Sequence, residues 1–144
     1  MASFTKVNDF VENAVEAMNL GTDTLAVALS NTAPGSESSN PTGDSNGILA
    51  NVTQISYTNC SSRTLTTSSS SQTGGTYKLV VADLTLTASG TVGPFRNIYL
   101  YDDTGTSPAD PLIGLYDYGA SVTLNNGDTF TLDFSPSNGV IQLA

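Results

Sequence analysis

The sequence predicts a mainly β protein, an antiparallel β-sandwich or a jelly-roll-like barrel with one N-terminal amphipathic helix. First, apolar and polar residues alternate from Val80 to Ala88, which is the period of a strand with one buried face. Second, the turn-forming pair Asn126-Gly127 separates two further apolar runs. Third, apolar residues recur at helical spacing near the N-terminus, in residues 6–19. At 144 residues, we expect a single domain, 1–144.

The helix is predicted from Lys6 to Asn19. Thr5 is the expected N-cap, and Gly21 is placed for a left-handed C-cap. We expect this helix to pack over one end or face of a sheet, with a docking helix as the alternative. Its apolar face is formed by Val7, Phe10, Val11, Ala14, Val15 and Met18.

The next elements alternate between short strands and polar connections. Residues 25–29 form the first strand, and residues 30–47 lack bulky side chains and apolar period, so we expect a mobile surface loop there. A short segment, 48–55, follows. The polar region 56–75 contains a short strand at 63–66 and ends in a connection, 68–75.

The second half of the chain contains the strongest strand signals. Residues 76–103 read as two strands with a break at 89–94. Pro111 is expected at the start of a strand, 112–118, because proline cannot donate to a sheet. Residues 121–134 are predicted as a hairpin with Phe130, Leu132 and Phe134 facing inward, and the last strand is 139–143.

Charge and composition exclude several kinds of partner. Four basic residues against thirteen acidic ones give a net charge of −9, which disfavours nucleic acid and anionic membrane surfaces as partners. No apolar run is long enough to span a membrane, and the N-terminus does not have the pattern of a signal peptide. Cys60 is the one cysteine, so no disulfide can form within the chain.

The residue types for common catalysis are missing. The chain has no histidine, which removes the usual general base, the usual metal ligand and any imidazole-dependent triad. A glycosidase needs only two carboxylates, and Asp83, Asp117 and Asp133 are the candidates. Their alternation with apolar neighbours places them on the outer face, and no phosphate-binding glycine loop is present. We therefore expect no enzyme activity, no catalytic residues and no cofactor.

Two further groups have both a structural and a functional interpretation. Asp102, Asp103 and Asp110 cluster around a turn and could bind calcium, but their spacing matches no EF-hand loop, so solvated loop acids are the favoured interpretation and no metal is assigned. Arg96 is one of four basic residues and stands at the start of a strand. An ion pair with a nearby Asp and a contact between subunits both explain it.

Four tyrosines form the last candidate group. Tyr99 and Tyr101 share one face of their strand, and Tyr116 and Tyr118 share one face of theirs. Such a set could stack against sugars, while packing in the core or between subunits explains it equally well.

Three segments together resemble a family of small structural proteins from tailed bacteriophages. They are FTKVNDFVENAVEAMNLGTDTLAVALSNTAP, SSSSQTGGTYKLVVADLTLTASGTVGPFRNIYLYDD and PLIGLYDYGASVTLNNGDTFTLDFSPSNGVIQL. The resemblance covers most of the chain except residues 35–46 and 59–67. It implies a virion protein, and among virion proteins a capsid decoration (cement) protein that stabilises the head shell at subunit junctions.

The resemblance also sets expectations for partners and location. The partner is the major capsid protein, and a homotrimer is expected by analogy with cement proteins. The protein would be made in the host bacterial cytoplasm and reside on the capsid surface of the virion. The alternative function is a tail or receptor-binding component that binds a host-surface glycan through the tyrosines.

Overall fold

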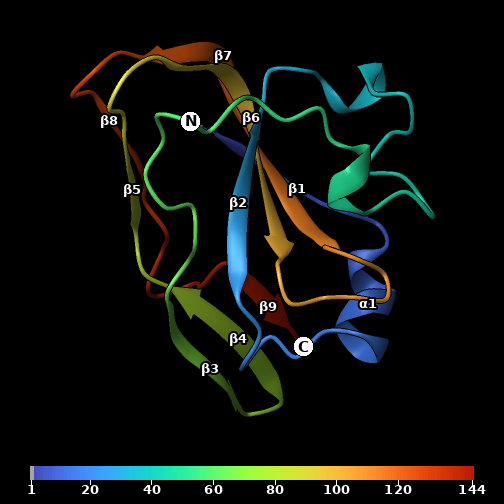
Figure 1. Ribbon diagram of the computed structural model, residues 1–144. Helices are drawn as coiled ribbons and strands as arrows, with labels where there is room; N and C mark the ends of the chain where they lie inside the picture. The colour runs from blue at the N-terminus through green and yellow to red at the C-terminus, as the bar shows by residue number, and fades with distance from the viewer. Residues whose placement is uncertain (1) are drawn as a thin grey trace.

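The computed structural model describes residues 2–144 and confirms a mainly β protein, with 45% of residues in strands and 9% in helices (Figure 1). The strands are β1 (Ser3–Lys6), β2 (Leu25–Ser30), β3 (Thr67–Thr73), β4 (Thr76–Val81), β5 (Leu84–Thr87), β6 (Val92–Asp102), β7 (Leu112–Leu124), β8 (Thr129–Leu132) and β9 (Ile141–Leu143). The helices are α1 (Phe10–Glu16) and two 3-10 turns, η1 (Pro34–Ser36) and η2 (Leu49–Asn51).

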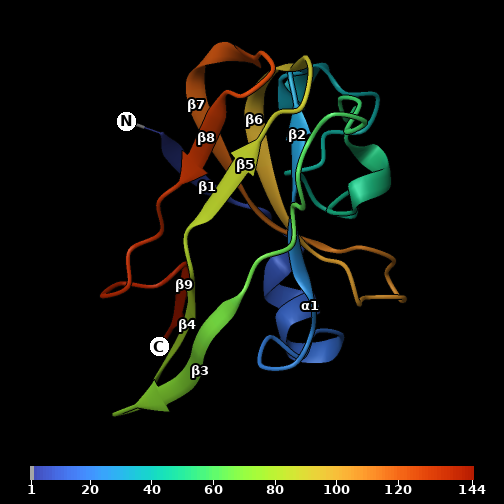
Figure 2. The same cartoon turned by 60° about the vertical axis from the view of Figure 1, so that its left-hand side comes forward.

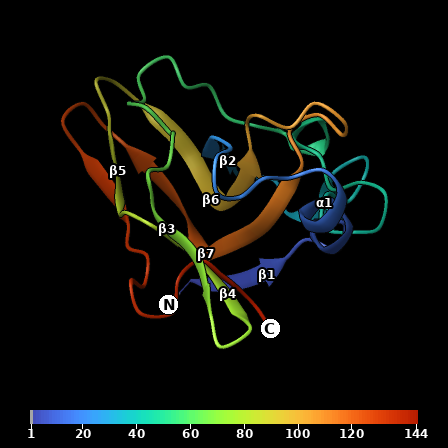
Figure 3. The ribbon, with the colours of Figure 1, turned by 90° about the horizontal axis from the view of Figure 1, so that it is seen from below.

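The strands form three antiparallel sheets in a β-sandwich-like arrangement. The largest has the order β1-β7-β6-β2, the second β3-β4-β9, and the third is the ribbon β5-β8. The β5–β8 ribbon and α1 lie on opposite sides of the large sheet, as Figures 1 and 3 both show. All three sheets contribute to one hydrophobic core, with fully buried Leu79 on β4, Leu86 on β5 and Tyr99 on β6.

The N-terminal helix is shorter than predicted. Residues 3–6 form β1, paired with residues 114–117 of β7, and α1 begins only at Phe10. Lys6 therefore lies in a strand, Asp9 is the N-cap position instead of Thr5, and the helix ends before Gly21 can cap it. The predicted apolar face is also divided, since Phe10 is buried while Val11 and Val15 are exposed. Pairing with the free edge of β7 outweighed the helical period of this segment.

The predicted hairpin at 121–134 is wrong, although its turn is present. Gly127 has a φ of +88°, and the Asp128 N–H donates to the Asn125 carbonyl at 2.9 Å. The following strand, β8, pairs with β5 and not with β7. Two backbone bonds with Ala88 fix this crossing, from the Gly127 N–H at 2.7 Å and to the Asp128 carbonyl at 3.0 Å.

Three other predicted boundaries need correction. Residues 68–75 were expected to be a connection, yet Thr67–Thr73 is strand β3, joined to β4 by a tight turn at Gly74-Gly75. Both glycines have positive φ, as a two-residue hairpin turn requires. The predicted central strand divides at Ala82-Asp83, so that β4 and β5 join different sheets. The break expected at 89–94 is shorter, because β6 begins at Val92.

Irregular segments cover the outer edge of β2. The Leu65 N–H donates to the Leu25 carbonyl at 2.8 Å, and the Ile55 N–H to the Leu29 carbonyl at 3.0 Å (Figure 2). The strand expected at 63–66 is thus reduced to one bridge between Thr64 and Ala26. The loop expected at 30–47 is tied to the helix start, where the Asp9 carboxylate accepts the Gly47 N–H at 2.8 Å. Between residues 2 and 144, no helix has the length and apolar character needed to cross a membrane.

Candidate functional site

A wide bulge in β7 shapes the surface next to the β5–β8 ribbon. In the pairing of β6 with β7, Phe95 lies opposite Val122 and Asn97 opposite Asp117. One residue of β6, Arg96, therefore faces the four residues 118–121 of β7. Gly119 has a φ of +90° inside this bulge, a conformation that favours glycine. A bulge bends its strand locally.

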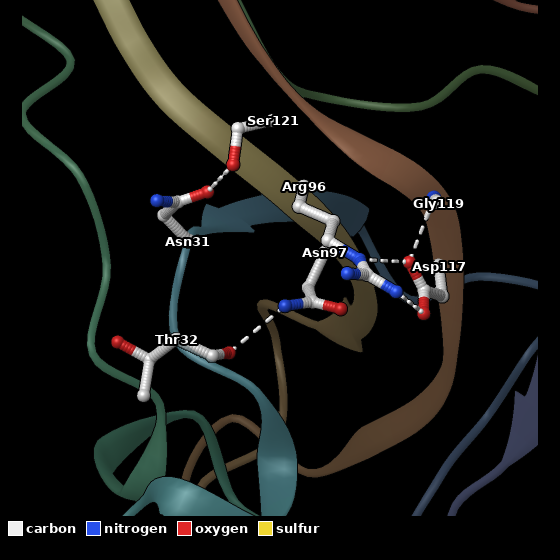
Figure 4. A network of polar contacts seen from close by, with 7 residues as sticks. All are labelled: Asn31, Thr32, Arg96, Asn97, Asp117, Gly119 and Ser121. Carbon is white, nitrogen blue, oxygen red and sulfur yellow. Dashed lines mark hydrogen bonds and ion pairs between the residues drawn. The ribbon is translucent and has the colours of Figure 1, made fainter.

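An ion pair closes the bulge on one side (Figure 4). The Arg96 guanidinium donates to both carboxylate oxygens of Asp117, at 2.7 and 2.8 Å, and the Gly119 N–H donates to the same carboxylate at 2.8 Å. The Arg96 contact, assisted by the Gly119 N–H, lowers the pKa of Asp117 below its usual value. The same hydrogen bond raises the pKa of Arg96. Arg96 thus forms the intrachain ion pair, one of its two predicted roles.

Two amide contacts fasten the other side of the bulge to the segment after β2. The Asn97 side-chain amide, which is buried, donates to the Thr32 carbonyl at 2.9 Å, and the Ser121 hydroxyl donates to the Asn31 side-chain carbonyl at 2.7 Å (Figure 4). With the ion pair, these contacts fix where the bulge begins and ends.

The bulge and β8 enclose an aromatic cleft of about 300 Å³. We use the term aromatic cleft for the space lined by Ala2, Ile98, Tyr116, Tyr118 and residues 130–134. The rings of Tyr118 and Phe130 meet edge to face at 5.3 Å between centroids, and those of Tyr116 and Phe134 at 6.2 Å. Burial raises the pKa of Tyr116, whereas Tyr118 is 46% exposed at the rim. Half-exposed aromatic rings can stack against an apolar or sugar ligand.

The four candidate tyrosines therefore separate into two pairs. Tyr99 and Tyr101 are buried in the core and cannot meet a ligand, whereas Tyr116 and Tyr118 line the aromatic cleft. The two phenylalanines of the cleft, Phe130 and Phe134, are predicted only as inward-facing residues. Their pairing with the tyrosines was missed because the sequence places β8 beside β7, and not across a cleft from it.

The candidate carboxylates have different surroundings. Asp83 accepts the Phe134 N–H at 2.8 Å, Asp117 is paired with Arg96, and Asp133 is exposed at the aromatic cleft. In the turn after β6, Asp102 is fully buried while Asp103 is exposed, so the predicted loop cluster does not act as one group. Within residues 2–144, no three His, Cys, Asp or Glu side chains are grouped so that they could bind a metal ion.

A second surface feature lies where β1, α1 and β9 meet. A groove of about 130 Å³ is lined there by Phe4 and Lys6 of β1, Phe10 of α1 and residues 140–143. Phe4 and Leu143 line this groove and are exposed, and Val11 and Val15 are exposed on α1. We use the term docking face for these four side chains. Val15 is 83% exposed, and β1 and β9 are both edge strands with one hydrogen-bonded neighbour each.

Comparison of the chain with family models, with curated proteins and with solved structures gives no match.

Proposed function

We propose that this chain is a structural protein of a bacteriophage virion, and specifically a capsid decoration protein that binds the major capsid protein at subunit junctions. The proposal starts from the resemblance of its three sequence segments to tailed-phage structural proteins. By the same analogy, the protein acts as a trimer on the outside of the head, after synthesis in the host bacterial cytoplasm.

The observation that carries the proposal is the docking face. Of the five exposed large apolar side chains within residues 2–144, four belong to it. Val11 and Val15, which are four residues apart on α1, lie on the same side of the helix. Beside them, β1 has one free edge that a further strand can extend. Modest contacts of this kind are enough for a protein that is added in many copies to a formed shell, because the symmetry of the shell repeats each contact many times.

The first experiment measures copy number by quantitative mass spectrometry of purified particles, with heads and tails analysed separately. A decoration protein is expected in the heads at a ratio near one copy per shell subunit. A few copies in the tail fraction, or none in the particle, would contradict the proposal.

A second experiment tests the docking face directly. Purified protein is added to heads that lack it, and bound copies are counted for wild type, Val11→Ser/Val15→Ser and Tyr118→Ser. The valine variant should bind at least tenfold more weakly, because burial of two valines is lost, while the Tyr118 variant should saturate the heads like wild type. Both changes are at exposed positions, so folding is retained and equal binding of all three proteins would contradict the assignment of this face.

The aromatic cleft supports the alternative, a tail or receptor-binding component that holds a host-surface glycan. Tyr118 at its rim and Asp133 beside it supply a stacking ring and a hydrogen-bond acceptor. This function predicts measurable affinity in a glycan screen, lost in Tyr118→Ser and retained in Val11→Ser/Val15→Ser. The two variants therefore distinguish the two functions. A decoration protein loses binding in the valine variant, whereas a glycan-binding protein loses binding in the Tyr118 variant.

A further inference from the structure

The carboxyl group of Asp102 lies in an unusual position at the end of β6. The residue is fully buried, and its Oδ1 accepts the N–H groups of Thr104 at 2.9 Å and Gly105 at 3.2 Å. Its Oδ2 is also buried, and no hydrogen bond to it is formed by any residue from 2 to 144. An ionised carboxylate with one buried, unpartnered oxygen is costly, which points to a missing proton or ligand.

The neighbour that explains this oxygen is a second carboxyl group, that of Asp23. Asp23 precedes β2 by two residues, and β2 pairs with β6 so that Leu25 lies opposite Asp102. This pairing and the bond from the Asp103 N–H to the Thr24 carbonyl bring the start of β2 next to Asp102. The Asp23 carboxyl acts on the Asp102 carboxyl there, and it also accepts the N–H of Asn19. Two carboxylates facing each other offer only acceptors, so neither can satisfy the other without a shared proton.

Among residues 2–144, no basic group acts on the Asp102 carboxyl to replace that proton. Burial raises the pKa of Asp102, and the nearby Asp23 carboxyl raises it further. The N–H groups of Thr104 and Gly105 act in the opposite direction. On the β2 side, Asp23 is the ionisable group that acts on Asp102. On the β6 side, the next residue in the chain is the exposed Asp103. All three groups are acidic.

The pair lies where two segments of the chain are joined. The Thr24 N–H donates to the Thr104 hydroxyl at 2.8 Å, and the Asp103 N–H donates to the Thr24 carbonyl at 2.8 Å. These bonds connect the entry of β2 to residues 103–111, the loop between β6 and β7. Any repulsion between Asp23 and Asp102 therefore acts on this connection.

We propose that Asp23 and Asp102 share one proton and form a pH-sensitive latch between the entry of β2 and the loop 103–111. In the closed latch, Asp102 Oδ2 carries the proton and donates it in a hydrogen bond to the Asp23 carboxylate, so the pair has one negative charge. When a base in solution removes the proton, two carboxylates remain and repel each other, which loosens the loop.

The sign of the pH dependence follows from the raised pKa of Asp102. The folded protein binds this proton more tightly than the unfolded chain does, so the stabilisation is complete below the ordinary aspartate pKa. It is lost as the pH rises through the raised pKa of the folded state. The latch is thus closed in acid solution and open in alkaline solution.

Asparagine variants test the latch, because an amide N–H can take the place of the shared proton. Melting temperatures of wild type, Asp102→Asn, Asp23→Asn and the control Asp133→Asn are compared between pH 4 and pH 8. Asp102→Asn should melt about 3 °C or more above wild type at pH 8 and lose most of the difference at acid pH. Asp23→Asn should show the same rise in melting temperature at pH 8. Asp133→Asn, which removes one exposed charge, should raise the melting temperature by less.

Two further measurements use the wild-type protein, so they test the latch even where a variant folds poorly. The Asp102 carboxyl carbon of the wild type is followed by NMR, and titration above the ordinary aspartate range supports the latch, whereas titration near the ordinary value overturns it. Wild type is also melted with calcium or magnesium chloride. Stabilisation by calcium at millimolar concentration that disappears in Asp102→Asn would show a cation in place of the proton and overturn the proposal.

Discussion

The hydroxyl groups of the partly buried Tyr57 and of the core residue Tyr99 have different hydrogen-bond partners. The Tyr57 hydroxyl accepts the Leu29 N–H at 2.9 Å and lies 2.9 Å from Gln54 Oε1. The Tyr99 hydroxyl is buried without a hydrogen-bond partner within residues 2–144, and burial raises its pKa strongly. A buried polar group without a partner costs free energy that an apolar replacement restores.

Replacing each tyrosine by phenylalanine should therefore have opposite effects. Tyr99→Phe is expected to leave the free energy of unfolding unchanged or to raise it by about 1 kcal/mol, because an unsatisfied hydroxyl is removed. Tyr57→Phe should lower it by about 1–2 kcal/mol, because Leu29 loses its acceptor. Urea unfolding of the two variants measures this difference, and a larger loss for Tyr99→Phe than for Tyr57→Phe would contradict it.

At the residue scale, the sequence predicts types of surroundings better than partners. Asp83 and Asp133 are exposed, as their alternation with apolar neighbours predicts, and Arg96 meets one of the acids. Which acid it meets depends on the bulge at residues 118–121, and a bulge of this width breaks the two-residue period on which the strand prediction rests. The aromatic cleft could not be predicted because β8 pairs with β5 and lies across a cleft from β7, and not beside it.

At the element scale, β1 depends on the absence of a side chain at one position of β7. Phe4 stacks on Tyr116 with ring centroids 4.8 Å apart, and its ring lies over Gly114. A Cβ added at Gly114 would be 2.4 Å from the Phe4 ring and 3.2 Å from the Thr5 carbonyl oxygen. The strand and its apolar side chain are therefore held by close approach to a glycine.

Gly114→Ala is expected to displace the Phe4 ring and weaken the pairing of β1 with β7. Hydrogen exchange of the amides in residues 3–7 should become at least tenfold faster, which corresponds to a loss of about 1.4 kcal/mol in local stability. Exchange in β2 should stay unchanged. Gly35→Ala is the matched control, because a Cβ at Gly35 meets nothing within 4 Å. Equal protection of β1 in both variants would contradict the role of Gly114.

The strands that the sequence predicts well are those buried on both faces. β2 is buried at all six positions, and β6 is buried from Asn97 to Asp102, so both are visible as apolar runs. β3 has mostly exposed residues and a serine-rich sequence, so residues 68–75 were predicted as a connection. Pairing partners were predicted less well, because β8 joins β5 across a long separation in sequence.

At the scale of the whole molecule, negative charge is largely uncompensated. The net charge is −9, and Arg96–Asp117 is the ion pair formed within residues 2–144. Arg63 is used inside the fold, where its guanidinium stacks 3.7 Å from the centre of the Tyr57 ring and donates to the Val27 carbonyl. Self-repulsion of this kind keeps a protein dispersed but lowers the stability of its compact state.

Screening this repulsion should stabilise the protein. Raising sodium chloride from 20 to 300 mM shortens the Debye length to below about 8 Å, so repulsion between distant carboxylates weakens while few attractive pairs are present to be lost. We expect the melting temperature at pH 7 to rise by several degrees. Glu16→Gln/Asp133→Asn should start from a higher melting temperature and gain less from salt. Both residues are exposed, and Glu16 lies at the helix C-terminus, where a negative charge is unfavourable. A melting temperature that falls with salt would mean that attractive pairs, and not repulsion, dominate the electrostatics of this fold.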